Sequence, residues 1–178
     1  MSFQIDQSGK IEDTAKNTVI AFSNDIQASV FISKKTKRQV QEAFRYHGEI
    51  SFFIDQIFAL AVFYLISDFI IEQKITIDLE YPGRDKFITR LINEHLKSHN
   101  KPPHDISFGR IGSKPKVHYA AKDVFDNKIK PTKILTLKQI LDKQKDRWAL
   151  KRVSFNPGRR SGPGPVRTSI SKKHKKSR

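Results

Sequence analysis

The chain has 178 residues, a length typical of one domain with an extension. It carries 34 Lys and Arg against 18 Asp and Glu, a formal net charge of +16, and has no cysteine. The lack of cysteine excludes a disulfide scaffold and a cysteine-ligated zinc site. A cationic surplus of this size predicts an anionic partner, most commonly nucleic acid, either DNA or RNA.

The positive charge is concentrated near the C-terminus. The stretch Arg147–Arg178 holds eleven of the basic residues and no acidic one, which leaves 23 basic and 18 acidic residues, a net charge of +5, for residues 1–146. Residues 154–178 combine Pro, Gly, Ser and charge, so they predict a disordered basic tail after a domain at 17–153. The tail residues expected to contact nucleic acid are Arg159, Arg160, Arg167, Lys172, Lys173, Lys175 and Lys176. A solubility tail or a targeting signal is the alternative.

The N-terminal residues 1–16 are polar and are interpreted as a leader without the apolar core of a secretory signal. A cytoplasmic protein, or a nucleoid or nuclear one, is therefore expected. Apolar, β-branched residues at 18–22 and 28–32 flank a Ser-Asn-Asp turn and predict a β-hairpin.

Two helices are predicted next. Residues 36–46 have helical spacing and a cationic first turn. Residues 51–71 are strongly apolar, but their uninterrupted apolar run at 57–66 is shorter than the roughly 20 residues of a membrane span. A buried central helix is the favoured interpretation, and a membrane or interfacial helix is the alternative.

The second half alternates strands and helices. Strands are predicted at 74–81 and 106–111, and helices at 84–96 and 117–127. Thr136 is a candidate cap for a last helix. The order predicts an α/β fold with a mixed sheet flanked by helices, in which an opening β-hairpin precedes a βαβα segment.

The strand at 74–81 carries the first candidate site. Asp78 and Glu80 are two residues apart in a strand, so they share a face, and such a pair can hold Mg²⁺ or Mn²⁺ together with a substrate phosphate. The alternative is an ordinary solvent-facing pair. Asp25 follows the first predicted strand and is either a third carboxylate of the site or a turn residue.

The segment 112–123 is the second candidate. A glycine-containing turn before a helix, with Lys114 and Lys116, can receive a phosphate at the helix N-terminus. His118 and Asp123 can position a water or a metal, whereas a hydrogen-bonded, partly buried histidine is the alternative. His95 and His99 have metal-competent spacing, but no carboxylate motif accompanies them, so we do not assign them a metal.

The hairpin, the acidic strand and the later acid-bearing helix together resemble the ribonuclease H-like superfamily, which includes Holliday-junction resolvases. That family carries metal-binding acids on its first strand, a middle strand and often its last helix. The resemblance implies catalytic roles for Asp25, for Asp78 or Glu80, and for Asp123. Two differences are visible: the sequence predicts two opening strands where the family has three, and Asp25 follows its strand instead of lying within it.

Two functions follow from these patterns. The first is a divalent-metal-dependent nuclease or resolvase that acts on structured DNA or RNA, with Mg²⁺ or Mn²⁺ as cofactor. The second is a non-catalytic RNA- or DNA-binding protein, ribonucleoprotein or chromatin-associated, without a cofactor. A membrane-surface protein that uses its basic tail on anionic lipid is the less favoured third.

Overall fold

The computed structural model describes residues 3–23, 26–111 and 116–154. Beyond Ser154, the predicted basic tail lies outside the described residues.

Six strands form one mixed sheet in the order β5-β4-β1-β2-β3-β6. The strands are β1 (Phe3–Ser8), β2 (Thr18–Ser23), β3 (Gln27–Ile32), β4 (Ile75–Asp78), β5 (Ile106–Gly109) and β6 (Lys133–Ile134). The strands β1, β2 and β3 pair antiparallel. The strands β4 and β5 run parallel to β1, and β6 runs parallel to β3. The predicted α/β class with a mixed sheet is confirmed.

The N-terminal segment requires a correction. The sequence predicts a polar leader at residues 1–16, but β1 occupies Phe3–Ser8 and lies between β2 and β4 in the sheet. Its alternate residues Phe3 and Ile5 are buried in the main core. The opening unit therefore has three antiparallel strands instead of a two-stranded hairpin.

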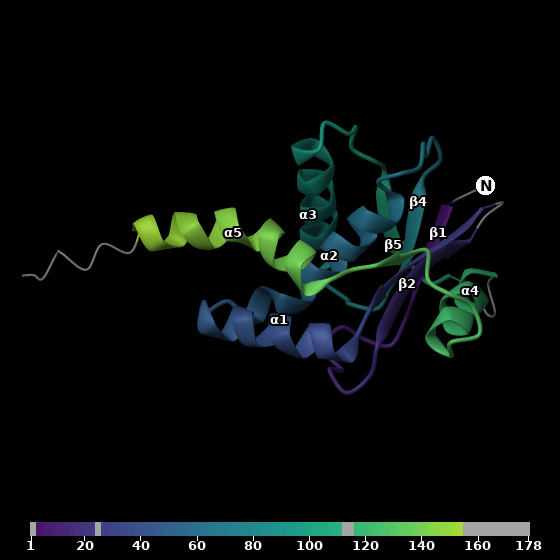
Figure 1. Ribbon diagram of the computed structural model, residues 1–178. Coiled ribbons are helices and arrows are strands. Elements are labelled where there is room, and N and C mark those ends of the chain that lie inside the picture. The colour runs from purple at the N-terminus through teal and green to yellow at the C-terminus, as the bar shows by residue number, and fades with distance from the viewer. Residues whose placement is uncertain (1–2, 24–25, 112–115, 155–178) are drawn as a thin grey trace, which may run out of the picture.

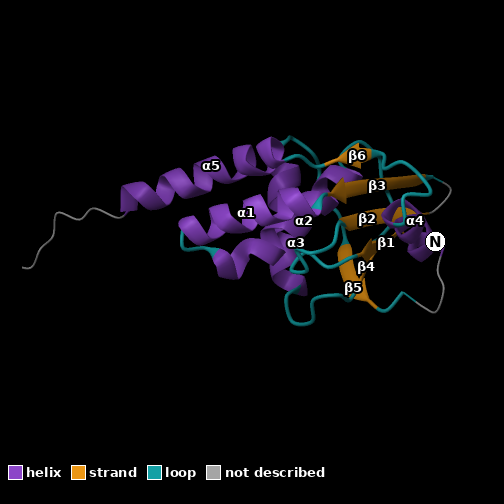
Figure 2. Ribbon diagram, turned by 60° about the horizontal axis from the view of Figure 1, so that its bottom comes forward, coloured by secondary structure: helices purple, strands orange, loops and turns teal. Residues whose placement is uncertain are grey.

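Helices cover both faces of the sheet. They are α1 (Lys34–Tyr46), the 3-10 helix η1 (Ile50–Phe52), α2 (Phe53–Ile66), α3 (Asp85–Ser98), α4 (Lys116–Phe125) and α5 (Leu137–Ser154). Figure 1 shows α1, α2, α3 and α5 on one side of the sheet and α4 on the other. Figure 2 shows the same layers from another side, with α5 extending along α1 away from the strands.

The helix α2 is the centre of the larger core, as predicted. Twelve of its fourteen residues are buried, because it is packed between the sheet and the neighbouring helices. Its buried Asp55 forms an ion pair with Arg84 at 3.1 Å, which offsets the cost of placing a carboxylate there. Among the described residues, no helix combines the length and apolarity that crossing a membrane requires.

The helix α5 is fixed to α1 and η1 through one aromatic residue. The Trp148 indole stacks on the His47 ring with centroids 4.1 Å apart and meets Phe44 edge-on. Its Nε1–H donates to Glu49 Oε2 at 3.2 Å, and Arg147 Nε reaches the same oxygen at 2.9 Å. At the other end of α5, Thr136 and Gln139 form a reciprocal cap, as predicted for Thr136.

Candidate metal centre

Two neighbouring parallel strands bring the first two carboxylates together. In the pairing of β1 with β4, Ile5 lies opposite Ile77, so Asp6 and Asp78 follow at equivalent positions. Side chains alternate along a strand, and the isoleucines point into the main core, so the two carboxylates lie on the opposite face, toward α4. Asp78 Oδ1 accepts the backbone N–H of Ile111 at 3.0 Å, which fixes its orientation from the segment after β5.

Glu80 is held by the residues on either side of it. Its backbone N–H donates to the Asp78 carbonyl at 2.9 Å, which turns the chain directly after β4. The next residue, Tyr81, is buried, and its hydroxyl accepts from Gln7 Nε2 and from the Ile11 N–H, both at 3.2 Å. The same hydroxyl donates to Glu12 Oε2 at 3.2 Å. These bonds tie the segment after β4 to the end of β1, so Glu80 is fixed beside Asp6.

Asp6, Asp78 and Glu80 together form the acidic cluster. One carboxylate oxygen from each residue lies within 4.8 Å of the others. Asp6 is the most enclosed, with a side chain only 7% exposed, whereas Glu80 is 25% exposed. The cluster is thus open on the Glu80 side.

Burial and mutual repulsion disfavour the ionised form of this cluster. Burial raises the pKa of Asp6, and the Asp78 charge raises it further, although the Gln7 N–H and His118 offset part of the effect. Burial also raises the pKa of Glu80, to which Asp78 and Asp6 add, against the opposing charge of Lys10. A cation bound between the three carboxylates would remove this repulsion.

The donor set fits a hard divalent cation. Mg²⁺ and Mn²⁺ prefer oxygen ligands, and Mg²⁺ is typically bound by one or two carboxylates with water and substrate phosphate completing its shell. The three converging carboxylates supply oxygen ligands of this kind, and the exposure of Glu80 leaves one side of the cluster accessible to water or phosphate. The predicted pair Asp78 and Glu80 would therefore bind the cation together with Asp6.

His118 joins the cluster from α4. Its Nδ1 lies 3.0 Å from Asp6 Oδ2, and its side chain is 48% exposed. An ionised Asp6 only accepts hydrogen bonds, so His118 Nδ1–H is then the donor. In the neutral ring this leaves Nε2 as an acceptor.

The loop that follows β1 carries Lys10 to the cluster. Lys10 Nζ lies 4.0 Å from Glu80 Oε2. Gly9, just before it, has φ +76°, and a Cβ at this position would overlap the Asn17 carbonyl oxygen. The buried Lys37 of α1 fixes this loop, because its Nζ donates to the carbonyls of Lys10 and Asp13, each at 2.7 Å. Burial lowers the pKa of Lys37 to about 8.

The other residues proposed from the sequence have different positions. Asp123 is not part of the acidic cluster, because its carboxylate pairs with Lys128 at 3.0 Å near the end of α4. Lys116 is the exposed first residue of α4, two residues before His118. Asp25, Lys114 and the tail residues Arg159, Arg160, Arg167, Lys172, Lys173, Lys175 and Lys176 lie outside the described residues.

Sequence reasoning missed Asp6, the most buried member of the cluster. The only signal for its strand is the apolar–polar alternation from Phe3 to Asp6, and Gln7 interrupts it where a third apolar residue would continue the pattern. The prediction of Asp25 as the acid of the first strand follows from the same omission, because without β1 the strand that ends just before Asp25 becomes the first.

The histidines of α3 form no metal site with acidic neighbours within the part of the chain that the structure describes. His99 Nδ1 contacts the His95 carbonyl at 2.7 Å, and His99 Nε2 contacts Lys143 Nζ at 2.6 Å. Burial, together with Lys143 and His99, lowers the pKa of His95 to about 4, so its ring is neutral at pH 7.

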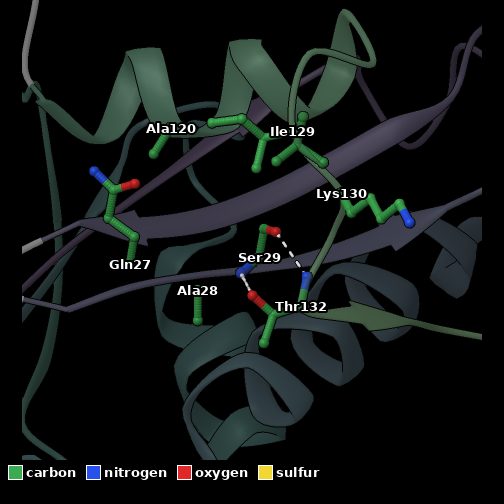
Figure 3. A pocket seen from close by; sticks show the side chains of 8 residues that line it. Gln27, Ala28, Ser29, Ala120, Ile129, Lys130 and Thr132 are labelled. Atoms are coloured by element: carbon green, nitrogen blue, oxygen red, sulfur yellow. Dashed lines mark hydrogen bonds between the residues drawn. The ribbon is translucent and has the colours of Figure 1, made fainter.

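A small pocket of about 170 Å³ lies beneath α4, against β3. Figure 3 shows Ala120 and Ile129 above Ser29 and Thr132. The Ser29 N–H donates to Thr132 Oγ1 at 3.1 Å, and the Thr132 N–H donates to Ser29 Oγ at 3.2 Å. This pair holds the segment before β6 against the sheet, and β3 is two strands away from the Asp6 strand.

Comparisons with protein-family models, curated proteins and solved structures give no significant match.

Proposed function

We propose that this protein is a divalent-metal-dependent nuclease that acts on structured DNA or RNA. The observation that carries the proposal is the convergence of Asp6, Asp78 and Glu80 within 4.8 Å. A metal ion at this position would activate the attacking water and neutralise charge on the scissile phosphate. The net charge of +16 supports a polyanionic substrate.

A ribonuclease H-like fold is part of this proposal. Both differences seen in the sequence disappear once β1 is included, because the opening unit has three strands and Asp6 lies inside the first of them. Asp6 replaces Asp25 as the acid of the first strand, and Asp78 is the acid of the middle strand. Asp123, which the sequence predicted as the acid of the last helix, pairs with Lys128 and does not take that role. The helix α4 contributes His118 to the cluster instead.

His118 is the residue that we assign to proton transfer. Asp6 fixes its ring through Nδ1, so Nε2 is available to accept a proton from a water or to hold one at a leaving oxygen. The His118 side chain is about half exposed, which supports its access to a substrate. Lys10 and Lys116 would contact phosphates that flank the reacting group.

A cleavage assay tests the proposal directly. Branched DNA, duplex DNA, RNA–DNA hybrid and structured RNA would be incubated with Mg²⁺, Mn²⁺ or EDTA. Wild type would be compared with Asp6→Asn and Asp78→Asn, each of which removes a charge and keeps the shape. In Asp78→Asn the amide oxygen of the new side chain can still accept the Ile111 N–H, so that variant is expected to fold.

The expected result is metal-dependent cleavage that both variants lose, with binding in EDTA unchanged or tighter because a repulsive charge is gone. Asp123→Asn, matched in chemistry but outside the cluster, should cleave as wild type does. Binding without metal-dependent cleavage of any substrate would refute the nuclease and favour the non-catalytic binding protein.

A further inference from the structure

A groove of about 620 Å³ lies between α3 and α5, on the other face of the sheet. It is lined by Phe52 of η1, by Gln56 of α2 and by residues of α3 and α5. The acidic cluster faces α4, on the opposite side of the sheet. The groove is therefore separate from the acidic cluster, and its volume falls within the range of small-molecule binding sites.

Two buried polar atoms of groove residues have no hydrogen-bond partner among the described residues: Gln144 Oε1 and His95 Nε2. Gln144 is only 1% exposed, and its amide Nε2 donates to Gln56 Oε1 at 3.5 Å. A buried polar group that lacks a partner is costly, which makes such atoms candidates for contact with a ligand.

The groove also presents aromatic rings and cations. The Arg147 guanidinium lies 4.8 Å from the Phe52 ring centroid, and the Arg90 guanidinium lies 5.0 Å from the Phe87 centroid. Lys143 adds a third cation, and Glu94, which pairs with Arg90 at 3.4 Å, is the one carboxylate among the lining residues. Phenylalanine rings and guanidinium planes are the surfaces on which nucleobases stack.

We propose that this groove binds a nucleotide. The base packs against Phe52 and Phe87, the side chains of Gln144 and His95 that line the groove turn their unpartnered atoms to it, and the phosphate faces Arg90 and Lys143. The chemistry is the same for a free nucleotide and for an unpaired nucleotide within a strand. The basic tail of this chain is a poorer electrostatic match than a phosphate, because the lining carries three cations and one carboxylate, Glu94.

The test uses the full chain and two probes at 150 mM salt, a concentration of about the physiological ionic strength. The first probe is AMP, GMP, CMP or UMP, each compared with its nucleoside by calorimetry. The second is a single-stranded oligonucleotide with one 2-aminopurine, whose fluorescence reports a change in stacking. Arg90→Gln and Gln144→Leu alter the groove, whereas Lys97→Gln on α3 and Lys138→Gln on α5 remove exposed charges outside it.

The expected result is binding that Arg90→Gln and Gln144→Leu each weaken about tenfold, while the two control variants bind as wild type does. A monophosphate that binds more tightly than its nucleoside identifies a free nucleotide as the ligand. A fluorescence change of 2-aminopurine without monophosphate binding identifies an unpaired base of a strand. Arg90 is exposed, so Arg90→Gln keeps the test valid if Gln144→Leu does not fold.

The proposal is overturned if neither probe binds, or if both groove variants bind like the controls. Because the groove is separate from the acidic cluster, Asp78→Asn should leave nucleotide binding unchanged. Failure of the nuclease assay would therefore not overturn nucleotide binding in the groove, and failure of the nucleotide-binding test would not overturn the nuclease proposal.

Discussion

Replacing Glu80 by Gln is expected to have opposite effects on stability without and with a divalent cation. Without a cation, the Glu80 charge lies within 4.8 Å of oxygens of Asp6 and Asp78. Two unit charges at that separation repel by about 3.5 kcal/mol at an effective dielectric of about 20. Solvent and Lys10 reduce this repulsion, so we expect Glu80→Gln to raise the free energy of unfolding by about 1 kcal/mol. That change corresponds to a Tm about 2–4 °C higher.

With a cation, the order of stability reverses. A ligand that binds only the folded state at 100 times its Kd adds about 2.7 kcal/mol to the free energy of unfolding of the wild type. Glu80→Gln lacks one of the three carboxylates and should gain much less. Thermal unfolding followed by circular dichroism, in EDTA and over a Mn²⁺ titration at pH 7.5, measures both effects.

Glu42→Gln is the matched control, because it removes an exposed carboxylate of α1 and changes the net charge equally. It should follow the wild type in both conditions. If Glu80→Gln and Glu42→Gln have the same Tm in EDTA and the same shift with Mn²⁺, the cation site is refuted.

Three further predictions concern the rest of the chain. Gly9→Ala should lower the free energy of unfolding by more than about 2 kcal/mol in urea titrations, because the new Cβ overlaps the Asn17 carbonyl oxygen and the backbone has a positive φ of +76°. Gly48→Ala should lower it by only about 1 kcal/mol, because Gly48 has a positive φ of +66° but open space around the new Cβ. His95 has a pKa lowered from 6.5 to about 4, so the unfolded chain protonates first and native stability falls as pH drops through that window. His95→Gln should reduce that fall by up to about 3 kcal/mol in urea titrations at several pH values, and an unchanged slope would contradict neutral burial. Deleting residues 156–178 should weaken nucleic-acid binding. It should also reduce the slope of log K against log salt concentration by about 0.9 for each phosphate that the tail neutralises in the full chain. Equal binding at every salt concentration would exclude a role for the tail.

Periodicity predicted the elements that bury apolar residues in a regular pattern. The helix α2 is apolar all round because it is enclosed, and β4 alternates because one of its faces meets the core. The strand β6 was missed because it has only two residues, and its position depends on pairing with β3. Such pairing is tertiary and leaves no local pattern in the sequence.

The candidate site was predicted only in part, and the reason is physical. Asp78 ends a regular strand, so it could be predicted as a site residue; Glu80 was predicted in the same strand, but β4 ends at Asp78 and Glu80 reaches the cluster from the turn that follows. Asp6 and Gln7 are buried polar residues whose partners, His118 and Tyr81, are far away in sequence. A strand that buries polar groups for a site loses the alternation by which strands are recognised.

The bond between Gln7 and Tyr81 joins residues 74 positions apart, and this separation has a consequence for folding kinetics. The strands β1, β2 and β3 are consecutive in the chain and pair with their sequence neighbours, whereas α1, η1 and α2 separate β4 from β3 in the sequence, so the pairing of β4 with β1 is non-local. Non-local pairing of this kind is slow to form, so the three carboxylates meet late. A cation that binds them should leave the folding rate unchanged and slow unfolding, giving the protein a longer native lifetime in its presence.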